Sequence, residues 1–115
     1  RLLNVDRRRA RLTLAWDFSE AAGASGKPDF GAAALALDAS VGPLAEALGV
    51  TLGPPLHATF RGAVPDPGET GLWTETTLRT LGDQWVVEAV LRDPLAPEGR
   101  ALEGTFLFER VDAGA

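Results

Sequence analysis

The 115-residue chain has the length of one domain, and its 45% hydrophobic and 23% charged content is that of an ordinary globular protein. A net charge of -5 argues against a broad nucleic-acid or acidic-membrane surface, because the chain would repel polyanions. Zero cysteines and a single histidine exclude a disulfide framework, a thiolate nucleophile and the usual zinc sites.

Targeting signals are absent from the sequence as it stands. No segment has the uninterrupted apolar run of a membrane span, and the Arg-rich start lacks the apolar stretch of a secretory signal. We therefore expect a cytoplasmic protein with one domain over residues 1–115. Because the chain begins at Arg1 rather than Met, we also expect an upstream segment.

The first element in chain order is a strand within residues 8–18. Its second half alternates, with Leu12, Leu14 and Trp16 on one side, which is the period of a half-buried strand. The next stretch, SEAAGASGKP, is rich in Gly, Ser and Ala and ends in Pro28, so it predicts a loop.

A helix is predicted from Phe30 to Leu48, roughly 28 Å long at 1.5 Å per residue, with Gly49 as its stop. At 100° per residue its large apolar side chains form one stripe: Phe30, Leu37, Val41, Leu44 and Leu48. The opposite side carries no charge, so we expect burial nearly all round: Ala32, Leu35, Ala39 and Pro43. Pro43 lacks an amide hydrogen and should kink the helix or split it after Gly42.

Four strand-length segments follow, rich in Val, Thr, Trp and Phe: HATFRGAV, GLWTETTLRT, QWVVEAVLRD and RALEGTFLFERV. The turns between them, PDPGE, LGD and PLAPEG, are short and favour antiparallel neighbours. These elements predict an α+β fold in which a curved antiparallel sheet wraps around the apolar helix.

Asp38 is the one charged residue between Asp29 and Glu46. Burying an unpartnered carboxylate costs several kcal/mol, so its position suggests a use. It lies about 90° from the centre of the apolar stripe, and its helical neighbours are small enough to leave room for a ligand: Gly31, Ala34, Gly42 and Ala45. The alternative is that Asp38 only holds the helix in place through loop backbone or a neighbouring subunit.

The order of elements and the segment DFGAAALALDA resemble the hotdog fold and, within it, acyl-CoA thioesterases of the phenylacetic-acid-degradation type. That family's central helix typically opens with His-Gly-Gly and carries an Asp seven residues after the second Gly. Here Gly31 and Asp38 have this spacing, while Asp29 and Phe30 stand where the pattern has His-Gly. Residues 57–110 resemble the family's sheet, including a strand that ends in Pro-x-x-Gly.

The resemblance implies a thioesterase that hydrolyses acyl- or aryl-CoA, or carrier-protein, thioesters. Asp38 would act as general base on water or as nucleophile, and the backbone near Gly31 would bind the oxyanion. The candidate substrate-binding residues are Phe30, Ala34, His57 and Arg61. It implies no metal, no cofactor besides the coenzyme A of the substrate, and no nucleic-acid or membrane partner. Because the family places its sites between subunits, a homodimer or homotetramer is expected.

Each candidate also has a structural interpretation. Asp29 fits a helix N-cap better than a replacement for histidine, and Gly31 serves equally well for close packing where the helix begins. His57 is the only histidine, and a lone His is more often structural than catalytic.

The basic side chains have two interpretations. A cluster at the start of the chain could bind the phosphates of coenzyme A or form a solvated strand end: Arg7, Arg8, Arg9 and Arg11. Arg61, Arg79 and Arg92 are equivalent candidates for phosphate contacts.

The replacement of His-Gly by Asp-Phe keeps a second function open. The chain could be a non-catalytic hotdog module that binds acyl groups or coenzyme A, or that serves assembly only. A hotdog dehydratase is less favoured, because that chemistry usually relies on a catalytic histidine and His57 lies outside the helix.

Overall fold

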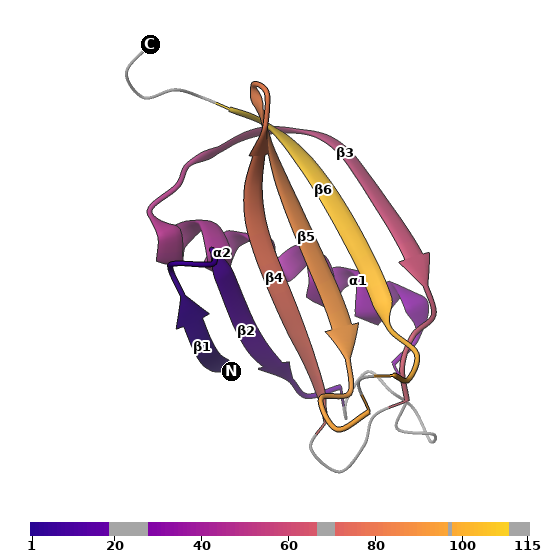
Figure 1. Cartoon of the computed structure of the whole chain (residues 1–115). Helices are drawn as coiled ribbons and strands as arrows, with labels where there is room; N and C mark the ends of the chain where they lie inside the picture. Colours follow the sequence, from indigo (N-terminus) through magenta and orange to yellow (C-terminus); the bar gives the residue numbers. More distant parts are fainter. Residues whose placement is uncertain (19–27, 67–70, 97, 111–115) are drawn as a thin grey trace.

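The computed structural model describes residues 1–18, 28–66, 71–96 and 98–110. In this part of the chain, one six-stranded antiparallel sheet has the order β1-β2-β4-β5-β6-β3, and two consecutive helices lie against one of its faces (Figure 1). The elements are β1 Leu2–Asp6, β2 Arg11–Trp16, α1 Phe30–Ala39, α2 Val41–Leu48, β3 Leu52–Gly62, β4 Leu72–Leu81, β5 Gln84–Arg92 and β6 Leu102–Arg110. The predicted α+β architecture is confirmed.

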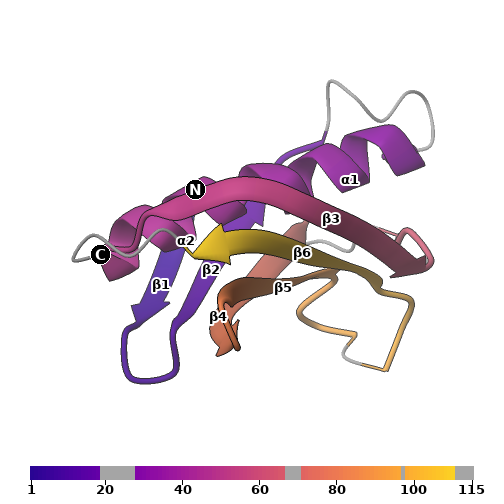
Figure 2. The same cartoon turned by 90° about the horizontal axis from the view of Figure 1, so that it is seen from above.

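The core lies between the helices and the concave face of the sheet. Seen from above, the long strands curve around the helical layer (Figure 2). Leu37, Val41 and Leu44 of the predicted stripe are buried there. They pack against alternate side chains of the strands: Leu12, Leu14, Leu72, Leu78, Val87, Ala89, Leu91, Leu102 and Phe106. The alternation that predicted the strands therefore also identifies their inner face.

The helical segment is divided at Ser40, two residues before Gly42, after which Pro43 was expected to split it. The missing N–H of Pro43 would have bonded the carbonyl of Ala39, so the first helix ends where that hydrogen bond is lost. Pro43 itself lies in the first turn of α2, where backbone N–H groups have no intrahelical partner. Gly49 ends α2 as predicted, with φ at 68° and the N–H of Val50 bonded to the carbonyl of Ala45 at 2.9 Å.

The expectation that the helix is buried nearly all round was wrong. Leu35 is 69% exposed, and Ala39, Gly42 and Pro43 are also exposed. Phe30, placed in the apolar stripe, is 55% exposed at the first residue of α1. A single sheet covers one side of a helix, so within one chain the opposite side meets solvent.

The two consecutive helices together, Phe30–Leu48, span 19 residues with a mean hydropathy of 1.2. By length and composition it could cross a membrane, contrary to the expectation from the sequence. The core helix of a globular domain passes the same test, and 33% of this stretch is buried against the sheet.

The first strand predicted, 8–18, is shorter in the structure, and a further strand precedes it. β1 pairs with β2, and residues 7–10 form the turn between them. β1 is only five residues long and none of its side chains is fully buried, so its period-2 pattern is short and weak in the sequence. The loop predicted after β2 lies mostly outside the described residues.

The remaining strands fall close to their predicted positions, with one extension. β3 begins at Leu52 rather than at the predicted His57. Its first residues were missed in the sequence because they include Pro54 and Pro55. Prolines argue against a strand in sequence, but β3 is at the edge of the sheet, where a missing N–H breaks no ladder bond. The predicted LGD turn is a tight hairpin in which Gly82 has φ of 59°.

Candidate functional site

Asp38 lies in the last turn of α1 and is exposed to solvent within the single chain. Its carboxylate makes no hydrogen bond or ion pair with the described residues. It belongs to the outer stripe of the helical segment, a row of exposed residues that face away from the sheet: Gly31, Leu35, Asp38, Ala39 and Gly42. The carboxylate is therefore available to a ligand or a second subunit, but one chain forms no enclosed cleft around it.

The N-terminus of α1 is closed by Asp29, as predicted. Its Oδ1 accepts a hydrogen bond from the backbone N–H of Ala32 at 2.7 Å, and its carbonyl accepts one from Ala33 at 3.0 Å. Asp29 is thus engaged as the N-cap. No described residue accepts a hydrogen bond from the N–H of Gly31, so this donor points out of the helix end, where the helix dipole favours negative charge.

Phe30 is held beside the helix start by two edge-to-face aromatic contacts. Its ring centroid lies 5.9 Å from that of Phe60 on β3, and Phe60 lies 5.7 Å from Phe106 on β6. Gly104 makes room for the last two rings, because an added Cβ would lie 3.1 Å from Phe106 and 3.2 Å from Phe60. Phe30 is therefore packed onto the sheet, with half its surface exposed.

His57 and Arg61 lie on the opposite face of the sheet from the helices. Phe60 points inward, so the neighbouring positions of β3 point outward, and Arg61 pairs in register with Glu103. The sequence-based set of substrate-binding residues is therefore divided within one chain. Phe30 and half-buried Ala34 are on the helical side, and His57 and Arg61 are on the outer face.

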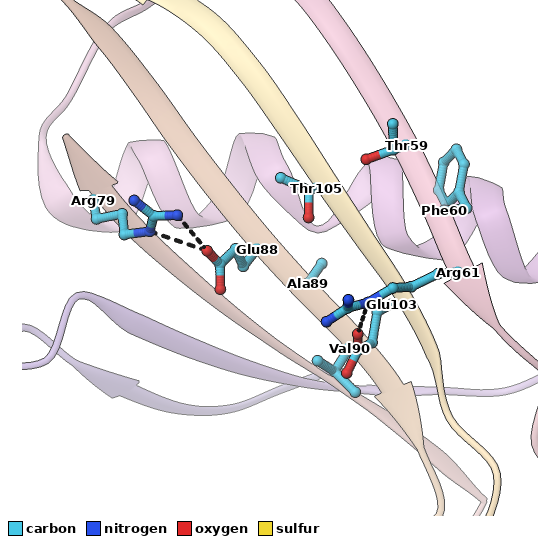
Figure 3. Close-up of a pocket in the computed structure, with 9 residues that line it drawn as sticks. All are labelled: Thr59, Phe60, Arg61, Arg79, Glu88, Ala89, Val90, Glu103 and Thr105. Carbon is cyan, nitrogen blue, oxygen red and sulfur yellow. Dashed lines mark hydrogen bonds and ion pairs between the residues drawn. The ribbon is translucent and has the colours of Figure 1, made fainter. Parts of the chain in front are cut away.

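The outer face contains a hollow of about 360 Å³ that crosses β3, β6, β5 and β4 (Figure 3). Arg61 Nε contacts Glu103 at 2.6 Å on one side, and Arg79 Nη2 contacts Glu88 at 2.9 Å on the other. Sequence reasoning missed the hydroxyl and acidic groups that line this hollow: Thr59, Glu88, Glu103 and Thr105. Their appearance at every second strand position was the available signal.

A buried polar cluster behind the helices was also missed. Ser40 and Thr74 are fully buried, and their hydroxyls join the junction of α1 and α2 to β4. Ser40 is buried whereas Asp38, two residues earlier, is exposed, so the two side chains point in different directions. Among the described residues, no group of three or more His, Asp or Glu side chains could hold a metal ion.

No family model and no curated protein matches the chain. Among solved structures, a thioesterase superfamily protein matches 86% of this chain with a TM-score of 0.65 and 23% identity. A Streptococcus mutans protein bound to acetyl-CoA matches 96% of this chain and 90% of its own length, with a TM-score of 0.65 and 13% identity. A hypothetical thioesterase with coenzyme A from Streptococcus pneumoniae matches 96% of this chain and 88% of its own length, with a TM-score of 0.64 and 15% identity.

The chain has the hotdog fold. The similarity covers the helices and the curved sheet together, so the resemblance drawn from the sequence is confirmed at the level of the fold. The chain spans 47% of the length of the thioesterase superfamily protein. Fold alone does not assign the chemistry, which depends on the residues of the site.

Proposed function

We propose that this hotdog domain is a thioesterase that hydrolyses acyl- or aryl-CoA thioesters, or thioesters of a carrier protein. The observation that carries the proposal is one helix that presents both an unengaged carboxylate, Asp38, and a capped N-terminus with an available N–H at Gly31. Structural neighbours that hold acetyl-CoA or coenzyme A support the substrate class.

The chemistry requires a base and an anion site. Asp38 would take a proton from water while the water oxygen attacks the thioester carbonyl carbon. The carbonyl electron pair moves to oxygen, and the N–H of Gly31 with the helix dipole would stabilise this oxyanion. When the carbonyl re-forms, the C–S bond breaks, and the thiolate takes up the proton. In the nucleophilic variant, the carboxylate of Asp38 attacks the carbonyl itself and the C–S bond breaks to release the thiolate. Water then cleaves the resulting anhydride into the free acid and Asp38.

The distance between Gly31 and Asp38 along α1 indicates that residues of two chains form each active site. Asp38 follows Gly31 by seven residues, which at 1.5 Å per residue is roughly 10 Å along the helix. Both groups must lie about 3 Å from one reacting carbonyl or its attacking water. We therefore propose a homodimer, alone or within a homotetramer, in which Asp38 acts together with Gly31 of the partner subunit.

Two exposed features fit such pairing. Leu35 is 69% exposed next to Asp38, and a second subunit would remove its apolar surface from water. Among the described residues, β3 is an edge strand that pairs with β6 alone, so its other edge is available there to a strand from a second chain. Covering the outer stripe would also place Asp38 in the cleft that a single chain lacks.

The test is hydrolysis of a panel of acyl- and aryl-CoA thioesters by the wild type and by Asp38→Asn. We expect kcat to fall by about 10²–10⁴-fold, because the amide can neither accept the proton nor attack. Asp29→Asn is the matched control, since Asn is an equally good N-cap on the same helix. If Asp38→Asn retains wild-type activity, the mechanism is wrong.

The docked ring of Phe30 favours a second candidate, a module that binds acyl groups or coenzyme A without catalysis. Phe30 contacts Phe60 where the family pattern has a glycine, so the opening beside the Gly31 amide is reduced. In that case the wild type binds coenzyme A but hydrolyses no member of the panel.

A further inference from the structure

Positive charge is concentrated at one place on this acidic protein. Residues 1–11 contain five of the 11 basic residues and one of the 16 acidic residues, so the rest of the chain is more acidic than its net charge of -5. Arg7, Arg8 and Arg9 occupy the turn between β1 and β2, and all three are exposed. Arg7 at the start of this basic hairpin contacts the last turn of α2, and the turn itself projects away from the helices (Figure 2).

The backbone of the basic hairpin is held in a defined conformation. Oδ1 of Asp6 accepts hydrogen bonds from the N–H groups of Arg8 and Arg9 at 3.1 and 3.2 Å. Ala10 closes the turn in the left-handed region, with φ of 52°. The three guanidinium groups therefore extend from a fixed turn rather than from a loose chain end.

The guanidinium groups are mostly uncommitted. Arg7 Nε donates to the carbonyl of Ala47 at 3.3 Å, which ties the hairpin to the last turn of α2 and leaves its terminal nitrogens available. Arg9 has only a loose contact of 3.9 Å with Asp6, and Arg8 pairs with no acidic side chain of the described residues. Arg8, Arg9 and Asp6 line an open hollow of about 580 Å³.

We propose that Arg7, Arg8 and Arg9 bind the phosphate groups of a coenzyme A thioester, an inference that rests on the proposed function. Guanidinium forks match phosphate oxygens in charge and geometry. A small anion is favoured over an acidic macromolecule, because a larger partner would also meet the acidic remainder of the chain.

The length of the ligand fits this placement. Asp38 and Ala47 are nine residues apart on the helical segment, roughly 14 Å at 1.5 Å per residue. The pantetheine arm is about as long as four extended residues, roughly 14 Å. A thioester at Asp38 can thus place its phosphates beside Arg7, which contacts Ala47.

The test compares binding of coenzyme A and of pantetheine, which lacks the phosphates, by calorimetry. In Arg8→Glu/Arg9→Glu we expect the Kd for coenzyme A to rise about tenfold and the Kd for pantetheine to stay unchanged. In the wild type, added NaCl should weaken binding of coenzyme A only. Arg8→Gln/Arg9→Gln, which removes the charges without reversing them, should show a smaller rise in the same direction.

Arg100→Glu is the matched control, because this exposed arginine lies in the connection between β5 and β6. Unchanged affinity for coenzyme A in both hairpin variants, an equal loss in Arg100→Glu, or no binding by the wild type would each overturn the inference.

The experiments distinguish a failure of the proposed thioesterase activity from a failure of the proposed phosphate site. If the wild type hydrolyses acyl-CoA thioesters and the hairpin variants keep its KM, only the phosphate site is wrong. If coenzyme A binding depends on the hairpin but no thioester is hydrolysed, the phosphate site stands and the thioesterase is wrong.

Discussion

The hydroxyl oxygens of Ser40 and Thr74 lie 3.2 Å apart in the core and connect the junction of α1 and α2 to β4. Ser40 Oγ is also 2.6 Å from the carbonyl oxygen of Ala36, and Trp16 Nε1 donates to Thr74 Oγ1 at 2.8 Å. A carbonyl only accepts and a hydroxyl has one proton, so Ser40 donates to Ala36 and Thr74 donates to Ser40. The hydrogen bonds therefore run in one direction from the indole to the helix end.

Thr74→Val should destabilise the fold. It leaves the Trp16 N–H without its partner and removes a donor to buried Ser40, at a cost of about 1–3 kcal/mol. In thermal unfolding this corresponds to a fall in Tm of roughly 4 °C or more. Thr76→Val is the control, because Thr76 is equally buried on the same strand but its Oγ1 has no hydrogen-bond partner in the described part of the chain. Replacing that hydroxyl should be neutral or stabilising, and equal losses in the two variants would contradict the hydrogen-bond chain.

Gly104→Ala should also lower stability. The added methyl group would lie 3.1 Å from the Phe106 ring and 3.2 Å from the Phe60 ring, and neither ring can move without disturbing the other. We expect a loss of about 1 kcal/mol in the free energy of unfolding by denaturant. Gly42→Ala provides the comparison, because a Cβ there meets nothing within 4 Å and alanine favours the helix. A stabilising effect at position 104 would show that the rings are loosely packed.

Asp29→Ala should destabilise the start of α1 by about 0.5–2 kcal/mol, since the N–H of Ala32 loses its acceptor. Asp29→Ser restores a capping oxygen and should recover most of the loss. Chemical denaturation of the three proteins measures both effects. If Asp29→Ser abolishes thioester hydrolysis while restoring stability, the carboxylate of Asp29 acts in the reaction beyond capping.

Leu35→Asp should weaken the proposed subunit pairing. A charge placed on the outer stripe next to Asp38 would be repelled and desolvated when a second chain covers it. Light scattering coupled to size exclusion should then show a shift from dimer or tetramer toward monomer. Leu95→Asp is matched in exposure, at 70% against 69% for Leu35, but lies in the connection after β5. The interface is elsewhere if both variants assemble like the wild type.

Local sequence patterns predicted the elements that depend on neighbouring residues only. The 100° spacing located the buried row of Leu37, Val41 and Leu44, and Gly49 marked the end of the helix. The short β1 escaped the same search because its five residues include no fully buried side chain, so its apolar alternation is weak. The start of β3 escaped it because prolines are tolerated only at a sheet edge, which is a property of topology.

The sequence by itself determined which residues can form the helix, its cap, its stop and the inner faces of the strands, because these follow from backbone periodicity and hydrogen bonds between close neighbours. Only the tertiary structure decided whether each face of the helix and of the sheet packs against another element or lies in solvent. It left Asp38 in solvent, because one sheet covers one side of the helix. It also separated Phe30 from Arg61 across the sheet, because the pairing of β3 with β6 sets which side chains point inward.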